Sequence, residues 1–107
     1  MPIIVQKYGG TSIGSIEKIN AVANKIIAEK NNGNDLVVVV SAMSGETNRL
    51  LELAKQANSD ASGRELDVLV STGEQVTISL LALALIEKGY KAISLTGSQA
   101  GILTDSV

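Results

Sequence analysis

The sequence predicts an α/β protein in which helices cover both faces of a mainly parallel sheet, giving a three-layer α/β/α sandwich. Three observations support this class. Strand-like and helix-like segments alternate along the 107 residues. Residues 36–40 are consecutive apolar residues, mostly β-branched, which is typical of a strand buried on both faces. Tyr8 and Tyr90 are the only aromatic residues, so the core must be built from aliphatic side chains.

The first predicted unit is a strand, a loop, a helix and a second strand. A short β-rich run at residues 3–5 leads into a glycine-rich loop at residues 9–15. Ser15 is a good N-cap, and Glu17 falls in the first helical turn, where the helix dipole favours an acidic residue. The polar residues 31–34 end that helix. Its apolar residues recur at helical spacing: Ile16, Ile19, Ala23, Ile26 and Ile27.

The second half is expected to be mostly helical. One helix begins near Glu46 and ends before Asn58. A short amphipathic helix is expected over residues 64–70, and a separate, more apolar helix over residues 73–88. A third strand is expected over residues 91–96.

Composition argues against several classes of function. The chain has no cysteine and no histidine, which argues against a metal site of the zinc type and excludes Ser-His or Cys-His catalysis within it. A net charge of −2 argues against a nucleic-acid partner. The longest apolar stretch, residues 78–86, is far shorter than the ~20 residues of a membrane span. The first apolar run is too short for a signal peptide. We therefore expect a cytoplasmic protein without a membrane partner.

Polar loops follow the predicted strands at residues 7–12, 41–48 and 96–101, and residues 71–74 could join them. In open α/β sheets, ligands bind beyond the carboxyl ends of the strands. The recurrence of such loops predicts a ligand site at that edge of the sheet.

The first of these loops suggests phosphate binding. Glycines let backbone N–H groups approach an anion closely, and the following helix N-terminus adds a positive dipole. The loop is not a Walker A motif, because Ser15 stands where the lysine belongs, and it lacks the third glycine of the dinucleotide-binding fingerprint. Lys7 instead precedes Gly9, where it could neutralise a transferring phosphoryl group. The alternative is a tight turn beside a solvated lysine.

Two other polar positions also have two explanations. Ser44 could cap the helix that begins near Glu46, and considered alone, capping is the better explanation of its segment. Glu74 stands in the expected first turn of an apolar helix, where the dipole favours a carboxylate. The functional alternative is that Glu74 binds a cationic group of a ligand, such as an α-amine.

Three blocks occur in order: VQKYGGTSI at residues 5–13, VVSAMSGETN at 39–48 and LVSTGEQ at 69–75. LTG at 95–97 and ILTD at 102–105 follow them. In sequence, order and separation, these blocks resemble the aspartokinases of the amino-acid kinase superfamily, over the whole chain. The resemblance implies an amino-acid kinase-like fold, incomplete here: residues 1–107 match the N-terminal part of the kinase domain. On this resemblance, we expect the nucleotide half and the regulatory ACT domains to lie outside these 107 residues.

The resemblance also implies a reaction. Aspartokinases use ATP with Mg²⁺ to phosphorylate the β-carboxylate of L-aspartate, giving 4-phospho-L-aspartate and ADP. This is the first step toward lysine, threonine, methionine and, in bacteria, diaminopimelate. The implied partners are L-aspartate and ATP, and the parent protein is expected to be a homo-oligomer. Because much of the site is missing, we expect this chain alone to be inactive.

Two groups of site residues follow from the resemblance. The phosphate group binds ATP, with Lys7 neutralising the transferring phosphoryl group and glycine amides holding it. Tyr8 stands where phenylalanine is common in the family. The substrate group lines the aspartate site, and its glutamate binds the substrate's α-amino group. The phosphate group is Lys7, Tyr8, Gly9 and Gly10, and the substrate group is Ser41, Thr47 and Glu74.

Two alternatives remain open at this point. The chain could belong to another carboxylate or carbamate kinase of the same superfamily, although the 41–48 and 71–75 segments favour aspartate. It could also be a stand-alone, non-catalytic module that binds an anion.

Overall fold

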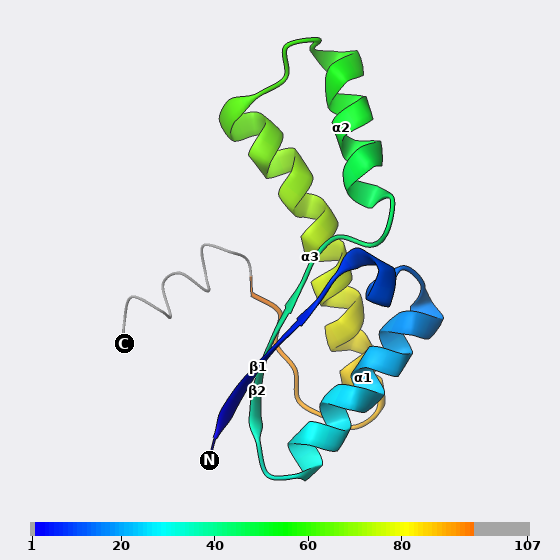
Figure 1. Cartoon of the computed structure of the whole chain (residues 1–107), viewed down its shortest axis with the longest axis vertical. Helices are drawn as coiled ribbons and strands as arrows, with labels where there is room; N and C mark the ends of the chain where they lie inside the picture. Colours follow the sequence, from blue (N-terminus) through cyan, green and yellow to red (C-terminus); the bar gives the residue numbers. More distant parts are fainter. Residues whose placement is uncertain (1, 96–107) are drawn as a thin grey trace.

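The computed structural model describes residues 2–95. The chain forms two strands, a short 3₁₀ helix and three α-helices, arranged as Figure 1 shows. In chain order, these elements are β1 (Ile3–Tyr8), η1 (Gly10–Ile13), α1 (Ile16–Asn31), β2 (Asp35–Val40), α2 (Glu46–Ala57) and α3 (Gly63–Glu87).

The β1–α1–β2 unit forms as predicted. β1 and β2 are parallel and in register from Ile3 opposite Asp35 to Tyr8 opposite Val40. Ser15 caps α1, because its Oγ accepts a hydrogen bond from the backbone N–H of Lys18 at 3.2 Å. This confirms an N-cap that the sequence alone indicated.

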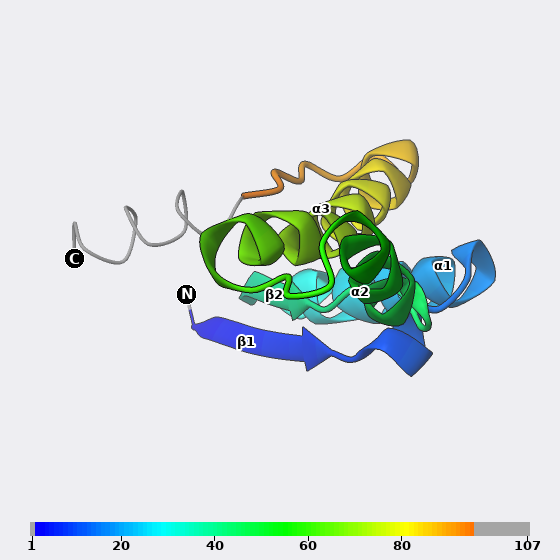
Figure 2. The same ribbon diagram turned by 90° about the horizontal axis from the view of Figure 1, so that it is seen from above.

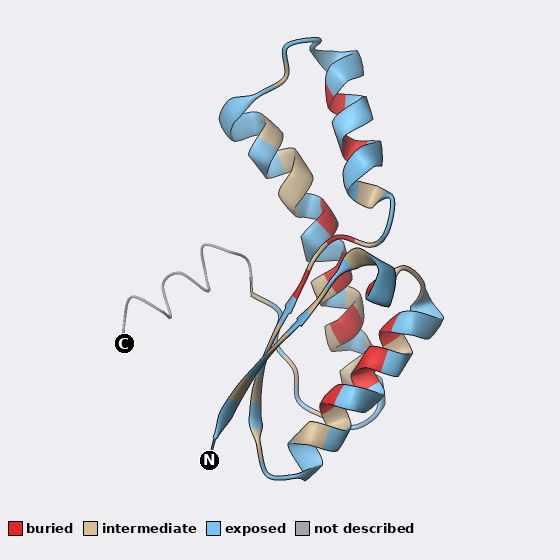
Figure 3. Cartoon of the chain, viewed as in Figure 1, coloured by how far each residue is buried: buried red, intermediate tan, exposed pale blue. Residues whose placement is uncertain are grey.

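Helices cover one face of this sheet. In Figures 1 and 2, α1 and the C-terminal half of α3 lie on the same side of the two strands. Buried positions gather between these elements (Figure 3). We call this side the covered face. The buried core comprises Ile13, Ile19, Val22, Ala23, Ile26, Val40 and Leu81.

The opposite side, which we call the open face, exposes the alternate strand residues. Val37 and Val39 are 51% and 45% exposed, and Ile3 and Val5 are more exposed still. The expectation that residues 36–40 are buried on both faces is therefore wrong for the structure of residues 2–95. The reason is that α1 and α3 pack on the same face. The α/β class with a parallel sheet is confirmed, and the sandwich is incomplete.

The helix α3 differs from the sequence prediction. The sequence predicts two helices, over residues 64–70 and 73–88, but one helix runs without a break from Gly63 to Glu87. The hydroxyl groups of Ser71 and Thr72 do not interrupt it, because they donate to the helical carbonyls of Val68 and Leu69 at 2.8 and 2.6 Å. Their polar side chains suggest a helix break in the sequence, but these hydrogen bonds to the preceding turn allow the helix to continue.

The third expected strand is also absent among the described residues. Residues 91–95 pair with neither β1 nor β2, and residue 96 lies outside the described part of the chain. The described sheet has two strands, so both of them are edge strands.

By length and composition alone, α3 is long and apolar enough to cross a membrane, unlike the shorter apolar stretch identified in the sequence. Core helices of soluble proteins pass the same test. Within this chain, Gly73, Thr77 and Leu81 of α3 are buried against the rest of the protein. Most other residues of α3 are partly or fully exposed in the described part of the chain.

Candidate functional site

The candidate site lies at the edge of the sheet where β1 and β2 end. Because the strands are parallel, their carboxyl ends meet at the same edge. The backbone N–H of Ser41 donates to the carbonyl of Tyr8 at 3.2 Å, and that of Ser44 donates to the carbonyl of Gly10 at 3.2 Å. The predicted loops 7–12 and 41–48 are therefore hydrogen-bonded neighbours.

Lys7 and Tyr8 point to opposite faces of the sheet. Lys7 is exposed on the open face and lies opposite Val39 in the strand register. The Tyr8 hydroxyl donates to Oε1 of Gln6 at 3.0 Å, and its ring packs against the core. Burial, followed by the negative charge of Glu29, raises the pKa of the Tyr8 phenol. The Tyr8 side chain therefore does not lie beside that of Lys7.

The two glycines after β1 have different surroundings. A Cβ on Gly9 would meet no heavy atom within 4 Å. A Cβ on Gly10 would lie 3.0 Å from the carbonyl oxygen of Ala42 and 3.3 Å from the nitrogen of Ser44. Gly9 thus borders open space that an anion could enter, and Gly10 is required for close packing between the two loops.

The glycine loop does not lead directly into an α-helix. The 3₁₀ helix η1 begins at Gly10, with Gly9 as its N-cap, and α1 begins only at Ile16. The expected helix dipole of α1 is therefore displaced from the glycines. The first N–H groups of a helical turn have no partner within it, so the amides at the start of η1 are the groups available to an anion here.

The second loop positions Ser41 and Thr47. Ser41 is half-buried, and its hydroxyl donates to the carbonyl of Ala42 at 3.4 Å. Thr47 is exposed in the first turn of α2. The N-cap of α2 is Gly45, in the left-handed conformation with φ of 83°, and no side chain caps this helix. The explanation of Ser44 as a capping residue is therefore wrong, because the chain turns into α2 one residue later than that explanation requires.

Glu46, beside Thr47, forms an ion pair within α2. Nε of Arg49 donates to Oε1 of Glu46 at 3.1 Å. This hydrogen bond holds the pKa of the Glu46 carboxyl below its usual value and raises the pKa of Arg49. The Glu46 carboxylate is therefore paired with a residue of its own helix.

Glu74 lies in the interior of α3 and is exposed. The expectation that it stands in the first turn of a helix is wrong, because α3 begins at Gly63. A helix dipole acts within the first and last turns, so it does not explain this carboxylate. The preceding residue, Gly73, is buried where α3 crosses the loop at Ala42. The 71–75 segment therefore meets the 41–48 loop, as expected, but through Gly73.

Two further features bound the site. The predicted 96–101 loop lies outside the described residues. Among residues 2–95, no three acidic side chains gather in a way that could hold a metal ion. The described part of the chain thus supplies Lys7, several hydroxyls and backbone amides, which suit a phosphorylated ligand. A second cation, the Lys18 ammonium, donates to the carbonyl of Thr11 in the 7–12 loop at 2.9 Å, and the sequence reasoning did not identify it.

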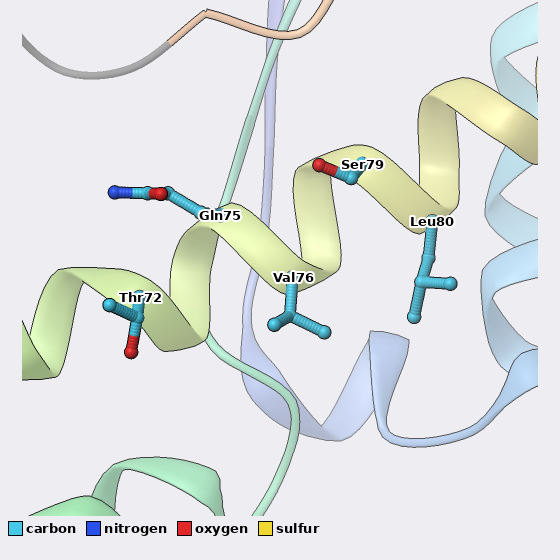
Figure 4. A pocket seen from close by; sticks show the side chains of 5 residues that line it. All are labelled: Thr72, Gln75, Val76, Ser79 and Leu80. Carbon is cyan, nitrogen blue, oxygen red and sulfur yellow. The ribbon is translucent and has the colours of Figure 1, made fainter.

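A shallow hollow of about 430 Å³ lies along α3 and includes Thr72 and Gln75 of the 71–75 segment. It is lined by α3 alone, and Figure 4 shows that its side chains do not converge on one point. It includes neither Lys7 nor Ser41 nor Glu74, so it is not the candidate site. The lining residues are Thr72, Gln75, Val76, Ser79 and Leu80.

Comparison with known proteins places this geometry in a family. Residues 2–107 match the family model described as the amino acid kinase family, so the chain belongs to that family. Several similar proteins carry the more specific name aspartokinase or aspartate kinase. The aspartokinase of Bacillus sp. strain MGA3 is 64% identical, over 100% of this chain and 26% of that protein. The aspartokinase of Geobacillus stearothermophilus is 63% identical, over the same shares.

A solved structure agrees with these sequence relatives. The crystal structure of aspartate kinase from Synechocystis has a TM-score of 0.87 and 56% sequence identity to this chain. The aligned region covers 91% of this chain and 17% of the Synechocystis chain. The chain spans about a quarter of the length of the curated relatives it matches.

Proposed function

We propose that the protein containing this chain is an aspartate kinase, which transfers the γ-phosphoryl group of ATP to the β-carboxylate of L-aspartate. A carboxylate oxygen forms the new P–O bond, the bond between the γ-phosphorus and its bridging oxygen breaks, and ADP leaves. The products are 4-phospho-L-aspartate and ADP. The observation that carries this proposal is the meeting of three motif segments at one sheet edge, in a chain more than 60% identical to named aspartokinases.

Charge and backbone amides explain how these residues act. In this proposal, the Lys7 ammonium neutralises the phosphoryl charge that develops during transfer. Gly9 lets its backbone approach the phosphate, since nothing occupies the space beside it. Ser41 and Thr47 bind the aspartate, and the exposed Glu74 carboxylate binds its α-ammonium group.

Mg²⁺ fits this proposal as a companion of ATP. Mg²⁺ is usually held by substrate phosphates together with one or two carboxylates, and it neutralises phosphate charge. Residues 2–95 contain no cluster of three acidic groups, so this part of the chain does not build a metal cage. In this proposal, Lys7 is the side chain of this part of the protein that neutralises phosphate charge alongside Mg²⁺.

The same proposal extends to the whole protein. Residues 1–107 form the N-terminal part of its kinase domain, and further nucleotide-binding and regulatory ACT regions follow in the parent chain. The parent acts in the cytoplasm as a homo-oligomer in the lysine, threonine and methionine pathways, without a nucleic-acid or membrane partner. Relatives about four times as long as this chain support the proposal that residues 1–107 are part of a longer protein.

A direct assay tests the function. The full-length protein is incubated with ATP, Mg²⁺ and one acceptor, and hydroxylamine traps any acyl phosphate as a hydroxamate. We expect a hydroxamate with L-aspartate and none with L-glutamate, N-acetyl-L-glutamate or carbamate. Reaction with one of those acceptors instead would identify a different member of the family. ATP-phosphate binding without turnover would favour the anion-binding module.

The variant Glu74→Gln tests the substrate assignment. We expect the aspartate KM to rise roughly 10- to 100-fold, because a hydrogen bond to a charged group contributes about 1.5–3 kcal/mol. The ATP KM should stay within about twofold, because Glu74 contacts no phosphate in this proposal. Glu87→Gln, at the far end of the same helix, is the matched control. An unchanged aspartate KM in Glu74→Gln would remove Glu74 from the substrate site.

A further inference from the structure

Three glycines surround the loop that begins the 41–48 segment. Gly10 begins η1, Gly14 is the C-cap of η1, and Gly73 lies inside α3. A Cβ on any of them would lie 3.0–3.3 Å from an atom of Ala42 or Ser44. We call Gly10, Gly14 and Gly73 the glycine cradle. Separations this short mean that a side chain at any of these glycines would push the loop by a few tenths of an ångström.

Backbone conformation does not require these glycines. Four glycines of the described chain have positive φ, and none of them belongs to the cradle. Gly73 even stands in a helix interior, where glycine costs about 1 kcal/mol relative to alanine. Gly73 therefore serves the close approach of α3 to the loop.

Ala42 is held on two sides of this cradle. Its carbonyl oxygen lies 3.0 Å from the position of a Cβ on Gly10, and its own Cβ lies 3.0 Å from the position of a Cβ on Gly73. The residue is 6% exposed. Ala42 also accepts the hydroxyl hydrogen bond of Ser41, a proposed substrate-binding residue.

We propose that Ala42, held between Gly10 and Gly73, is a positioning residue for phosphoryl transfer. It sets the separation between the Lys7 loop, the Ser41 hydroxyl and the Glu74 position on α3. This inference rests on the proposed function, since it concerns the alignment of the phosphate and aspartate groups. Ala42 acts through its neighbours. A small displacement of Ala42 should lower the rate of phosphoryl transfer, because a misplacement of reacting groups by about 1 Å can already cost ~10²-fold in rate.

The proposal is tested by adding a methyl group at Gly73 and then removing the methyl group of Ala42 that faces it. In the full-length protein, Gly73→Ala places a methyl 3.0 Å from that of Ala42, and the loop must shift by a few tenths of an ångström. We expect kcat/KM for aspartate to fall roughly 10-fold. The double variant Ala42→Gly with Gly73→Ala removes the opposing methyl and leaves Leu50 Cδ1, at 3.3 Å, which is the end of a flexible side chain and can move aside. It should therefore return kcat/KM to within about threefold of the unchanged protein.

A matched variant and a second readout separate positioning from stability. Ser79→Ala changes a residue of the same helix that lies outside the cradle, and it should leave kcat, KM and Tm unchanged. Gly73→Ala should lower kcat/KM even when it is measured well below the Tm of the variant, because crowding of the buried Ala42 offsets the better helix propensity of alanine and only positioning then limits the rate. Amide hydrogen exchange should quicken at residues 41–48 in Gly73→Ala and slow again in the double variant.

Each outcome decides between the explanations. An unchanged kcat/KM and unchanged exchange in Gly73→Ala would overturn the proposal, as would a double variant no better than the single one. If Gly73→Ala does not fold, Ala42→Gly alone is used, which should quicken exchange at 41–48 and raise the aspartate KM. If the unchanged protein does not use aspartate, the proposed function fails, and the exchange results still decide whether Gly73 positions the loop through Ala42.

Discussion

The two faces of the sheet share the same strands but have different surroundings. On the covered face, Leu36 and Val38 pack against the core, where Val40 is buried. On the open face, Ile3 is 69% exposed, and Lys7 also lies there. One side therefore holds the fold together, and the other carries the cation of the candidate site. This separation means that changes on the two faces should affect different measurements.

The largest effect on stability is expected from the covered face. Ile19 is fully buried between the helices and the sheet, so Ile19→Ala removes packed methylene groups and leaves a cavity. We expect a loss of about 2–5 kcal/mol in the free energy of unfolding, measured by urea denaturation. The matched change on the open face, Ile3→Ala, should cost much less. Equal losses for both variants would show that the open face is packed in solution.

The largest effect on activity without loss of stability is expected from Lys7→Ala. Removing one electrostatic group that acts on the transition state typically lowers kcat ~10²–10³-fold. Because Lys7 is exposed, the melting temperature should not change. Steady-state kinetics and a thermal melt of the full-length protein measure both quantities, with the exposed Lys55→Ala on α2 as control. A normal kcat with a raised aspartate KM would place Lys7 in ground-state binding instead.

A smaller effect concerns association through the open face. Exposed apolar patches and unpaired strand edges promote self-association, so we expect the 107-residue chain to associate in analytical ultracentrifugation. Changing Val37 and Val39 to threonine should shift it toward monomer, because threonine keeps the β-branched shape and adds a hydroxyl. Stability should change by less than about 0.5 kcal/mol per site. If the unchanged chain is a monodisperse monomer with a sharp cooperative melt, this prediction is wrong.

The smallest effect is expected from an ion pair at the start of β2. Lys30 Nζ donates to Oδ1 of Asp35 at 2.9 Å, which holds the pKa of the Asp35 carboxyl below its usual value of 3.8. Since the folded pKa is lowered, the pair stabilises the protein above the unfolded pKa and loses its contribution as the pH falls through the folded value. Both groups are exposed, so salt should screen the effect.

The variant Asp35→Asn measures this contribution. Its melting temperature should lie slightly below that of the unchanged protein near neutral pH, and the difference should vanish in strong acid and in concentrated salt. A difference that persists in strong acid would assign the effect to something other than the ion pair.

Local signals along the chain determined much of this protein by themselves. Ser15 caps α1 through a bond to a residue three positions away, and the polar residues 31–34 end that helix, so both signals are readable from neighbours in the chain. The parallel pairing of β1 and β2 follows from the same short β–α–β pattern. The motif blocks likewise indicated the family that the comparisons establish.

Only the tertiary structure decided the course of α3 and the face that stays open. Residues 71–73 carry the composition of a helix break, but Gly73 fits against Ala42 from a distant part of the chain, and this contact is absent from the local sequence. Likewise, the valines of β2 have the same composition on both faces, and the packing of α1 and α3 chooses which ones are buried. The physical reason is that steric fit and coverage depend on atoms brought together by folding, whereas caps and periodicity depend on neighbours in sequence.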